Sequence, residues 1–273
     1  MVWEDGGREP PSYPISQRDQ GDMSTHFFDR EAWDPLAKAL KAYSQGDCCA
    51  ALTVHSDAGD PETMEVGLFF RSRENLRPVD LEALRRVRGR VLDVGAGVGC
   101  ISLILQNEGF RVTAVEMIPE AVEIMRDQGV EDPREGSVER MEQSRSYDTL
   151  LLLMNGPAIA GTLVGFPRLL GTLDGLMASG GQVLLDSTDL RSRRSPQDRA
   201  TGSTPGSPGD AGEYPGELQY QMEFRGEKGA PFPQLFLDPD TLEDLATSEG
   251  WRTEIVWTGS EGEYLACLKR IGE

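Results

Sequence analysis

The amino-acid sequence predicts an α/β protein whose central sheet is mostly parallel and is covered by helices on both faces. From Arg90 onward, apolar runs of strand length alternate with amphipathic helical stretches, which is typical of such a sheet. The first of these runs breaks into alternating glycines just before a helical segment. With 273 residues, the chain is also long enough to bury a substantial core without disulfides.

The segment before Arg90 predicts a smaller unit that precedes the main domain. Residues 1–22 are rich in Pro, Gly, Asp and Gln without any period, and we expect a flexible N-terminal tail there. Residues 23–89 are expected to form a helical cap and a lead-in to the main domain. Local patterns in this unit predict a helix over 29–42, β-prone runs over 49–55 and 65–70 around the turn-forming AGDPE, and a helix over 81–87.

Residues 90–273 are expected to form the main domain. Strands are expected over 90–94, 111–116, 147–154 and 182–186, with a weak one near Arg134, and helices over 100–108, 119–128 and 160–178. Ser, Gly, Pro and Arg then dominate 191–216, which we expect to be a disordered insertion inside this domain. After the insertion come an expected hairpin over 217–225 and 234–238, a helix over 239–249, and strands over 253–257 and 264–269.

The composition is strongly acidic, with 46 Asp and Glu against 27 Lys and Arg and a net charge of −19. Such a field repels polyanions and no basic cluster interrupts it, so no nucleic-acid partner is expected. The chain has no apolar run long enough to cross a bilayer, and its N-terminus lacks the pattern of a signal peptide. We therefore expect a soluble, cytoplasmic protein with no membrane partner. The four cysteines form no C-x-x-C pair and there are only two histidines, so no metal site is expected.

The motif VLDVGAGVG at 91–99 carries the strongest chemical signal. Its alternating glycines let the backbone approach a ligand closely, and the following helix offers unpaired N–H groups and the positive end of its dipole. A dinucleotide fingerprint would place its third glycine where this chain has Cys100. That fingerprint also does not require an acid at the position of Asp93. The motif therefore predicts a nucleotide-type ligand and argues against NAD.

Glu116 ends the next predicted strand, 21 residues after Gly95. A carboxylate at the end of that strand can accept hydrogen bonds from both hydroxyls of a ribose. Several nucleotide cofactors share this spacing, so it predicts a ribose without selecting the cofactor. The alternative is a surface Glu at a strand end, which the glycine motif upstream disfavours.

These residues resemble the class I S-adenosylmethionine-dependent methyltransferases. The resemblance rests on DVGAGVG at 93–99, on VEM at 115–117, and on YDTL at 147–150 opening a fourth strand that ends in MNG at 154–156. VHSD near the start, LFFR before the first strand and LLLMNGP at the fourth also resemble a group of uncharacterised bacterial methyltransferases. The resemblance implies a Rossmann-like methyltransferase fold with a seven-stranded sheet, a reversed C-terminal hairpin, an N-terminal helical cap and an inserted β-hairpin. It implies no particular acceptor.

The resemblance also implies which residues hold S-adenosylmethionine. The glycine loop would cradle the methionine part, Asp93 would lie near its ammonium group, and Glu116 would bind the ribose. Met117 would lie against the adenine. The acid that often follows the third strand is missing, and Ser137 and Val138 are the nearest candidates for that adenine contact. The expected cofactor-binding residues are Asp93, Gly95, Ala96, Gly97, Gly99, Glu116, Met117, Ser137, Val138, Met154 and Asn155.

The reaction itself is expected at the end of the fourth strand, since ligands of open α/β sheets bind at the carboxyl ends of strands. Asn155 could offer its side chain to the acceptor or the cofactor there, and the alternative is a turn Asn before Gly-Pro. The sequence NGP lacks the aromatic residue of the N-P-P-Y and D-P-P-Y motifs, which weakens a base-methylating function. His26 and His55 are candidate general bases, with an ordinary surface or core position as the alternative for each.

The sequence thus predicts an enzyme that moves the sulfonium methyl group to an oxygen, nitrogen or carbon of a small molecule by in-line displacement. Alternatives are a protein or RNA methyltransferase, a non-catalytic cofactor-binding protein, an NAD-dependent oxidoreductase and a polyamine synthase. The synthase would require paired acids where this chain reads NGP. Aromatic residues of the hairpin region either line an acceptor pocket or pack a small extra sheet, and they are Tyr214, Tyr220, Phe224, Phe232 and Phe236.

Overall fold

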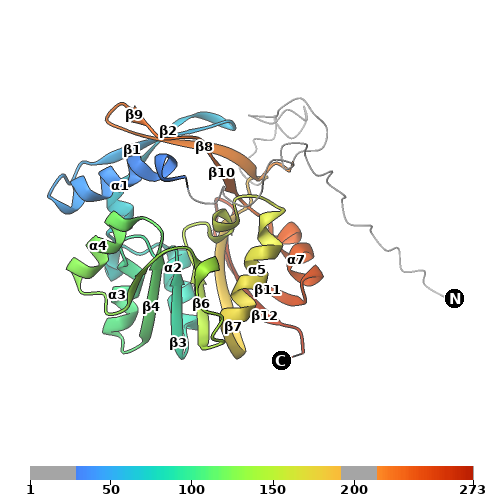
Figure 1. The fold of residues 1–273 in the computed structure, drawn as a ribbon. Coiled ribbons are helices and arrows are strands. Elements are labelled where there is room, and N and C mark those ends of the chain that lie inside the picture. The colour runs from blue at the N-terminus through green and yellow to red at the C-terminus, as the bar shows by residue number, and fades with distance from the viewer. Residues whose placement is uncertain (1–28, 192–213, 273) are drawn as a thin grey trace.

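The computed structural model describes residues 29–191 and 214–272, and it confirms the predicted α/β fold (Figure 1). Its main sheet has seven strands in the order β11-β12-β7-β6-β3-β4-β5. The strands from β7 to β5 pair in parallel, whereas β12 pairs antiparallel with both β7 and β11. The strands are β3 (Arg90–Val94), β4 (Arg111–Glu116), β5 (Pro133–Glu135), β6 (Tyr147–Leu152), β7 (Met177–Thr188), β11 (Trp251–Thr258) and β12 (Glu263–Arg270).

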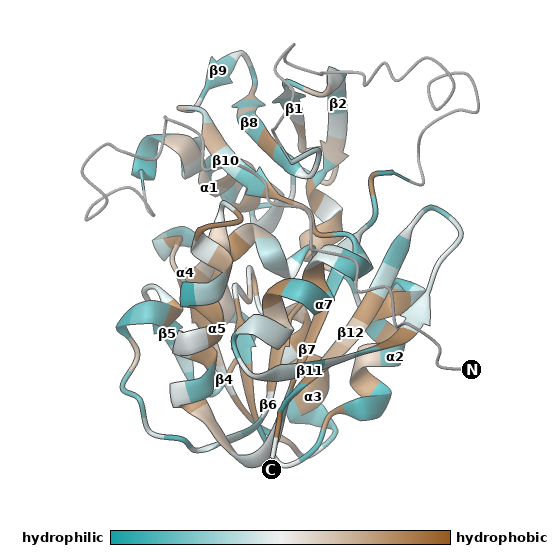
Figure 2. Ribbon diagram, turned by 90° about the vertical axis from the view of Figure 1, so that its right-hand side faces the viewer, coloured by the Kyte–Doolittle hydropathy of each residue, from teal (hydrophilic) through white to brown (hydrophobic). Residues whose placement is uncertain are grey.

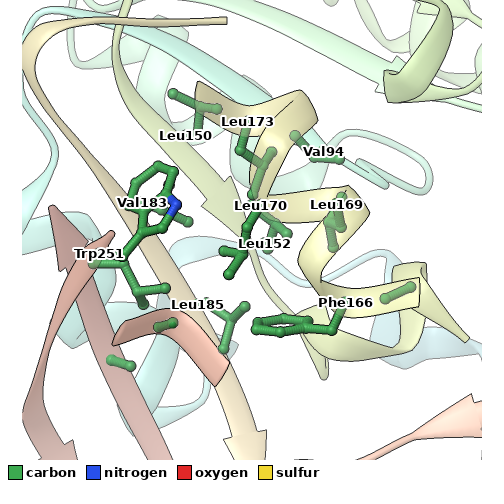
Figure 3. Close-up of a cluster of buried hydrophobic side chains, with 14 of the residues drawn as sticks. Val94, Leu150, Leu152, Phe166, Leu169, Leu170, Leu173, Val183, Leu185 and Trp251 are labelled. Atoms are coloured by element: carbon green, nitrogen blue, oxygen red, sulfur yellow. The ribbon is translucent and has the colours of Figure 1, made fainter. Parts of the chain in front are cut away.

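Alternate residues of the central strands pack against different helices, because successive side chains of a strand point to opposite faces. Leu150 and Leu152 of β6 belong to the core with α5 and α7, whereas Leu151 belongs to the core with α2 and α3. Figure 3 shows the first core, where Phe166 and Leu170 of α5 pack against the sheet. In Figure 2 the strands of this sheet are mostly brown and the outward helix surfaces carry the teal. The helices are α2 (Pro78–Arg86), α3 (Cys100–Asn107), α4 (Pro119–Gln128), α5 (Gly165–Leu176) and α7 (Pro239–Ser248).

Local chemistry explains where these helices begin and end. Helix α4 starts with Pro119, whose missing N–H costs nothing in a first turn, and ends at Gly129, which adopts a φ of 89°. Helix α7 is capped by Asp238, whose Oδ1 accepts the N–H of Thr241 at 3.1 Å.

A second, five-stranded sheet lies across the top of the molecule in Figure 1. Its order is β10-β8-β1-β2, with β9 also paired to β8, and all pairs are antiparallel. Strand β1 comes from the N-terminal unit and β8 from beyond the insertion, with Val54 opposite Met222. Helix α1 (Arg30–Ser44) packs between this sheet and α4. The strands are β1 (Ala51–Ser56), β2 (Gly59–Glu65), β8 (Glu217–Phe224), β9 (Glu227–Lys228) and β10 (Phe232–Leu235).

The β-prone run over 65–70 is not a strand in the structure. The strand β2 lies earlier, and Val66–Phe69 forms a 3₁₀-helix, η2. The reason is a tight turn that places Ser56 opposite Gly59, so that pairing already begins inside AGDPE. Pro61 is tolerated in β2 because this strand is at the edge of the sheet.

Several expectations concern residues outside the described ranges. They are the N-terminal tail, His26 and most of the 191–216 insertion. Within the described ranges, every helix is too short or too polar to traverse a bilayer. The same ranges contain no group of three or more His, Cys, Asp or Glu side chains placed to hold a metal ion.

Candidate functional site

A cavity of about 710 Å³ lies between the carboxyl ends of the parallel strands and the second sheet. Its volume is in the range of pockets that enclose small-molecule ligands. We call the side formed by the ends of β3, β4 and β6 the floor, and the side formed by α1 and the five-stranded sheet the roof. The floor includes Gly95, Glu116 and Met154, and the roof includes Trp33 and Phe232.

The glycine loop after β3 is held against β4 by its own backbone. The N–H groups of Gly95 and Ala96 both donate to the carbonyl oxygen of Val115, at 2.9 and 3.1 Å. Gly97 has a φ of 57°, a left-handed conformation that glycine adopts without strain. Gly95, Ala96 and Gly97 all line the cavity, so bare backbone is what the floor offers a ligand here.

Unlike Gly95 and Gly97, Gly99 does not line the cavity. It has a φ of 82°, and a Cβ atom there would lie 2.8 Å from both Met125 Cγ and Val130 Cγ2. The sequence placed Gly99 among the cofactor contacts. In the structure, Gly99 instead allows the start of α3 to pack closely against α4, where a side chain would not fit.

Glu116 is buried at the end of β4 and accepts three backbone hydrogen bonds. Its Oε2 accepts the N–H of Gly97 at 2.9 Å, and its Oε1 accepts those of Met117 and Ile118 at 2.7 and 3.0 Å. Burial raises the pKa of this carboxyl group, and the three N–H donors oppose that rise. Since a carboxylate has about four acceptor positions, one position remains for a ligand.

Asp93 lies under the glycine loop, where it lines the cavity and is 4% exposed. Its Oδ2 accepts the hydroxyl of Ser102 at 2.7 Å. Burial raises the pKa of Asp93 to about 6, with the negative charge of Glu116 adding to the rise and the Ser102 hydroxyl opposing it. The two acids therefore make the floor a place that favours a cationic or hydrogen-bond-donating ligand.

Four further residues from the sequence analysis line the cavity, namely Met117, Ser137, Val138 and Met154. Met117 follows Glu116 directly, and Val138 is buried in the 3₁₀-helix η4 (Val138–Arg140). Ser137 caps this helix, with its Oγ accepting the N–H of Glu139 at 3.3 Å. The apolar side chains of Met117 and Val138 thus flank the side of the floor next to β4 and β5.

Asn155 lines the cavity just beyond β6, and its side chain is engaged inside the protein. Its Nδ2 donates to the carbonyl oxygen of Leu235 in β10 at 2.9 Å, and its Oδ1 accepts the hydroxyl of Ser187 in β7 at 3.0 Å. The backbone N–H of Asn155 donates to Oδ1 of Asp186 at 2.8 Å. Asn155 therefore connects the floor to the roof by hydrogen bonds. The sequence analysis considered a ligand contact or a simple turn position for this residue, and neither includes this connection.

Arg71 is a cavity-lining residue that the sequence reasoning missed. Its Nη2 donates to Oδ2 of the fully buried Asp80 at 3.0 Å, and its Nη1 donates to the carbonyl oxygen of Leu68. Its Nε is buried without a hydrogen-bond partner in the described part of the chain. Buried polar atoms are normally satisfied, so this nitrogen points to an anionic or carbonyl group of a ligand. Only the LFFR motif marked this arginine in the sequence, and nothing there indicated a buried position.

The structure does not bring His55 to the cavity. Val54 lines the cavity, and because side chains alternate along a strand, His55 in β1 faces the outer side of the roof. There its Nε2 lies 2.9 Å from Oε2 of Glu223.

The hairpin aromatics divide into two groups. Tyr220 and Phe232 line the cavity, with their ring centroids 6.3 Å apart. The other three pack elsewhere: the Tyr214 hydroxyl donates to Oδ2 of Asp238 at 2.8 Å, Phe224 is buried with α1, and Phe236 lies against the Tyr220 ring with centroids 6.2 Å apart. Tyr220 and Phe232 are therefore the two hairpin aromatics that face the cavity, and whether they contact an acceptor stays a prediction.

A family model described as a methyltransferase domain matches residues 92–155. The chain is 31% identical to a SAM-dependent methyltransferase from Bacteroides fragilis, solved in complex with S-adenosyl-L-homocysteine. That alignment covers 89% of this chain and 97% of the other, with a TM-score of 0.78. The CcbJ methyltransferase from Streptomyces caelestis shares the fold at 14% identity, with a TM-score of 0.54 and coverage of 71% and 88%.

Among curated proteins, the ubiquinone biosynthesis O-methyltransferase of Xanthomonas euvesicatoria pv. vesicatoria (strain 85-10) is 41% identical over 86 residues. That match covers 28% of this chain and 36% of the relative. The same-named protein of Xylella fastidiosa (strain M23) is 42% identical over 60 residues, 20% of this chain and 24% of the relative. The chain thus spans about a quarter to a third of the length of the curated relatives that it matches.

Proposed function

The chain belongs to the S-adenosylmethionine-dependent methyltransferases, and we propose that it transfers a methyl group to a small molecule enclosed between the floor and the roof. The observation that carries this proposal is the cavity, which joins the glycine loop and Glu116 on one side to an apolar roof on the other. Membership of this family supports S-adenosylmethionine as the methyl donor. The enclosure of the cavity supports a small acceptor.

The residues of the floor fit the parts of S-adenosylmethionine. Arg71 would receive the carboxylate of the methionine part, which would satisfy its unpaired Nε, and Asp93 would lie near the ammonium group. Glu116 would accept one ribose hydroxyl at its free position and the second in place of the Gly97 N–H. Met117 and Val138 offer apolar contact to the adenine.

Bound S-adenosylmethionine supplies an electrophilic methyl group on a sulfonium centre. The chain's own contribution is position: holding the two reactants near contact distance supplies about 7–11 kcal/mol of the barrier. Asn155 serves this purpose, because its hydrogen bonds to Leu235 and Ser187 fix the spacing between floor and roof. The roof also excludes water from the reacting groups.

Two observations narrow the acceptor within this proposal. The curated relatives carry the name ubiquinone biosynthesis O-methyltransferase, which favours oxygen as the methylated atom. Helix α1 and the five-stranded sheet cover the floor, so a folded protein or an RNA would have to displace them to reach it. A small-molecule acceptor requires no such displacement.

Calorimetry with S-adenosylhomocysteine and with NAD tests the cofactor, and conversion of S-adenosylmethionine to S-adenosylhomocysteine in the presence of candidate acceptors tests the reaction. We expect S-adenosylhomocysteine to bind in the micromolar range and NAD to give no heat. Binding of NAD alone would overturn the proposal. If S-adenosylhomocysteine binds and methyl transfer occurs to protein or RNA but not to small molecules, the acceptor is a macromolecule and not a small molecule.

A further inference from the structure

We propose that the acceptor is a flat aromatic compound whose acidic hydroxyl group is methylated as its oxyanion, and that Arg168 binds this anionic form. The inference rests on the proposed function. It is carried by one part of the cavity, which we call the acceptor end. The acceptor end consists of cavity-lining residues from three places. They belong to the stretch from the 3₁₀-helix η5 (Gly156–Ala160) to the first turn of α5, to strand β8, and to strand β10.

A row of aromatic rings forms the roof over the acceptor end. The Trp33 and Phe232 rings have centroids 4.9 Å apart and an interplanar angle of 33°, and Tyr220 meets Phe232 edge to face. Methionine side chains from both sides of the cavity, Met154 and Met222, supply adaptable apolar contact. Such a surface favours a flat, apolar body, because an aromatic ring gains both burial and ring–ring contact against it.

The acceptor end has a positive charge in a chain whose net charge is −19. Arg168 is exposed in the first turn of α5, and among the described residues its guanidinium has no carboxylate partner. The cavity's other arginine, Arg71, pairs with Asp80 and is assigned above to the carboxylate of the cofactor. An anionic acceptor would therefore be attracted to Arg168, whereas a protonated amine would be repelled.

The acceptor end also provides no general base. Apart from Arg168, its only ionisable side chain among the described residues is Tyr220. The roof contributes one acid, Asp29, which caps α1 by accepting the N–H of Glu31 at 2.9 Å and lies outside the acceptor end. Because no base is placed among the described residues of the acceptor end, an acceptor that ionises by its own acidity is favoured, and a phenol does so far more readily than an aliphatic alcohol.

The transfer step balances in charge and in electrons. The acceptor hydroxyl gives its proton to water, and the oxyanion forms the new C–O bond with the methyl carbon. The C–S bond breaks at the same time, and its electron pair stays on the sulfur. One anion and one sulfonium cation become a neutral ether and a neutral thioether, so an apolar roof is suited to the products.

The test uses 4-nitrophenol as the probe, because its phenolate has an absorption band of its own. The full-length protein is saturated with S-adenosylhomocysteine, and the absorbance of the bound probe is recorded across pH. We expect the bound probe to ionise at lower pH than the free probe. Replacing Arg168 by Gln should weaken binding of the phenolate about two- to fivefold, as for other exposed charge pairs. The matched control is Arg126→Gln on α4, an exposed arginine outside the cavity lining, which should leave binding unchanged.

A second pair of variants tests the aromatic roof. Phe232→Leu should weaken binding of 4-nitrophenolate about two- to tenfold, the range of a lost ring–ring contact. Phe236→Leu is the control, because Phe236 packs against Tyr220 without lining the cavity.

The outcomes separate this inference from the proposed function. If S-adenosylhomocysteine binds but the probe binds only in its neutral form, or if Arg168→Gln has no more effect than Arg126→Gln, the anionic acceptor is wrong and the methyltransferase function stands. If S-adenosylhomocysteine itself does not bind, the proposed function fails first. Preferential binding of the phenolate, lost in Arg168→Gln and weakened in Phe232→Leu, supports the inference.

Discussion

The floor and the roof of the cavity are built in different ways. The floor is fixed by backbone hydrogen bonds, with Glu116 accepting three N–H groups and the glycine loop tied to Val115. The roof is shaped by the packing of side chains such as Trp33 and Phe232. A side chain of the roof can be exchanged without removing these backbone hydrogen bonds, whereas a substitution of Glu116 or of the glycine loop alters them directly. We therefore propose that the floor determines the cofactor and that the roof, together with the acceptor end, determines the acceptor.

The largest effect is expected from Gly99→Ala, at the start of α3 beneath the floor. A Cβ atom there would lie 2.8 Å from Met125 Cγ and Val130 Cγ2, and the φ of 82° is strained for alanine. We expect the free energy of unfolding to fall by about 2–4 kcal/mol from strain and overpacking together. The control is Gly129→Ala, where φ is 89° but no atom lies within 4 Å of the added Cβ. Urea denaturation should show a loss of only about 1 kcal/mol for this control. Equal losses in the two variants would mean that the floor is not tightly packed beneath its loop.

Glu116→Ala should produce the next largest effect, this time on cofactor binding. Removing the carboxylate deletes the proposed ribose contacts, and we expect calorimetry to show S-adenosylhomocysteine binding weakened by about 1.5–3 kcal/mol. Phe232→Ala in the roof serves as the comparison. Its affinity for S-adenosylhomocysteine should stay within about twofold of the wild-type value, a smaller change than the loss of one hydrogen bond causes. Unchanged affinity in Glu116→Ala would remove this residue from the ribose site.

Asn155→Gly tests the connection between the two regions. Glycine adopts the φ of 68° without strain, so the variant removes only the bonds to Leu235 and Ser187. We expect a loss of about 1–3 kcal/mol in unfolding free energy, since each lost bond contributes about 0.5–1.5 kcal/mol. Asn155→Ala should be less stable than Asn155→Gly, because alanine is strained at this φ. A thermal denaturation midpoint equal to that of the wild type would show that Asn155 does not hold the roof in place.

The floor alone should give cofactor binding a pH dependence. Asp93 has a pKa raised to about 6, so its carboxylate is charged above that pH and becomes protonated as the pH falls through it. Burial raises the pKa of Glu116 in the same direction. If Asp93 pairs with the ammonium group of the ligand, affinity for S-adenosylhomocysteine is complete near pH 7 and falls about tenfold by pH 5. Asp93→Asn should bind more weakly at pH 7 and flatten the profile. A profile as steep in Asp93→Asn as in the wild type would assign the titration to another group.

His55→Ala should have the smallest effect of all. The partly buried pair of His55 and Glu223 on the outer side of the roof stabilises the fold by less than about 1 kcal/mol. We expect turnover and cofactor affinity to match those of the wild type. A loss of kcat with intact folding would restore His55 as a candidate base.

The floor was predictable because its signals are local in the sequence. Asp93, the glycines and Glu116 stand at the ends of strands in one motif and one spacing, and parallel strands bring those ends together. Gly99 is the exception, because only the packing of α4 decides that it faces inward.

The sequence predicted the cap helix and the hairpin that form much of the roof, but not which of their residues face the cavity, because that depends on contacts between distant segments. Val54 and Met222 become neighbours only when β1 pairs with β8. Whether Val54 or His55 faces the cavity then depends on a register that no local pattern fixes. Arg71 is also unmarked by any local pattern, because only the folded structure buries it against Asp80, nine residues further on in α2.

A crystal structure of the protein with S-adenosylhomocysteine bound tests the division between floor and roof most directly. We expect the ribose hydroxyls on the carboxylate of Glu116, the amino-acid part along the loop from Gly95 to Gly97, and the sulfur atom facing Phe232 across the acceptor end. A ligand bound outside this cavity, or a sulfur atom that faces away from the roof, would contradict it.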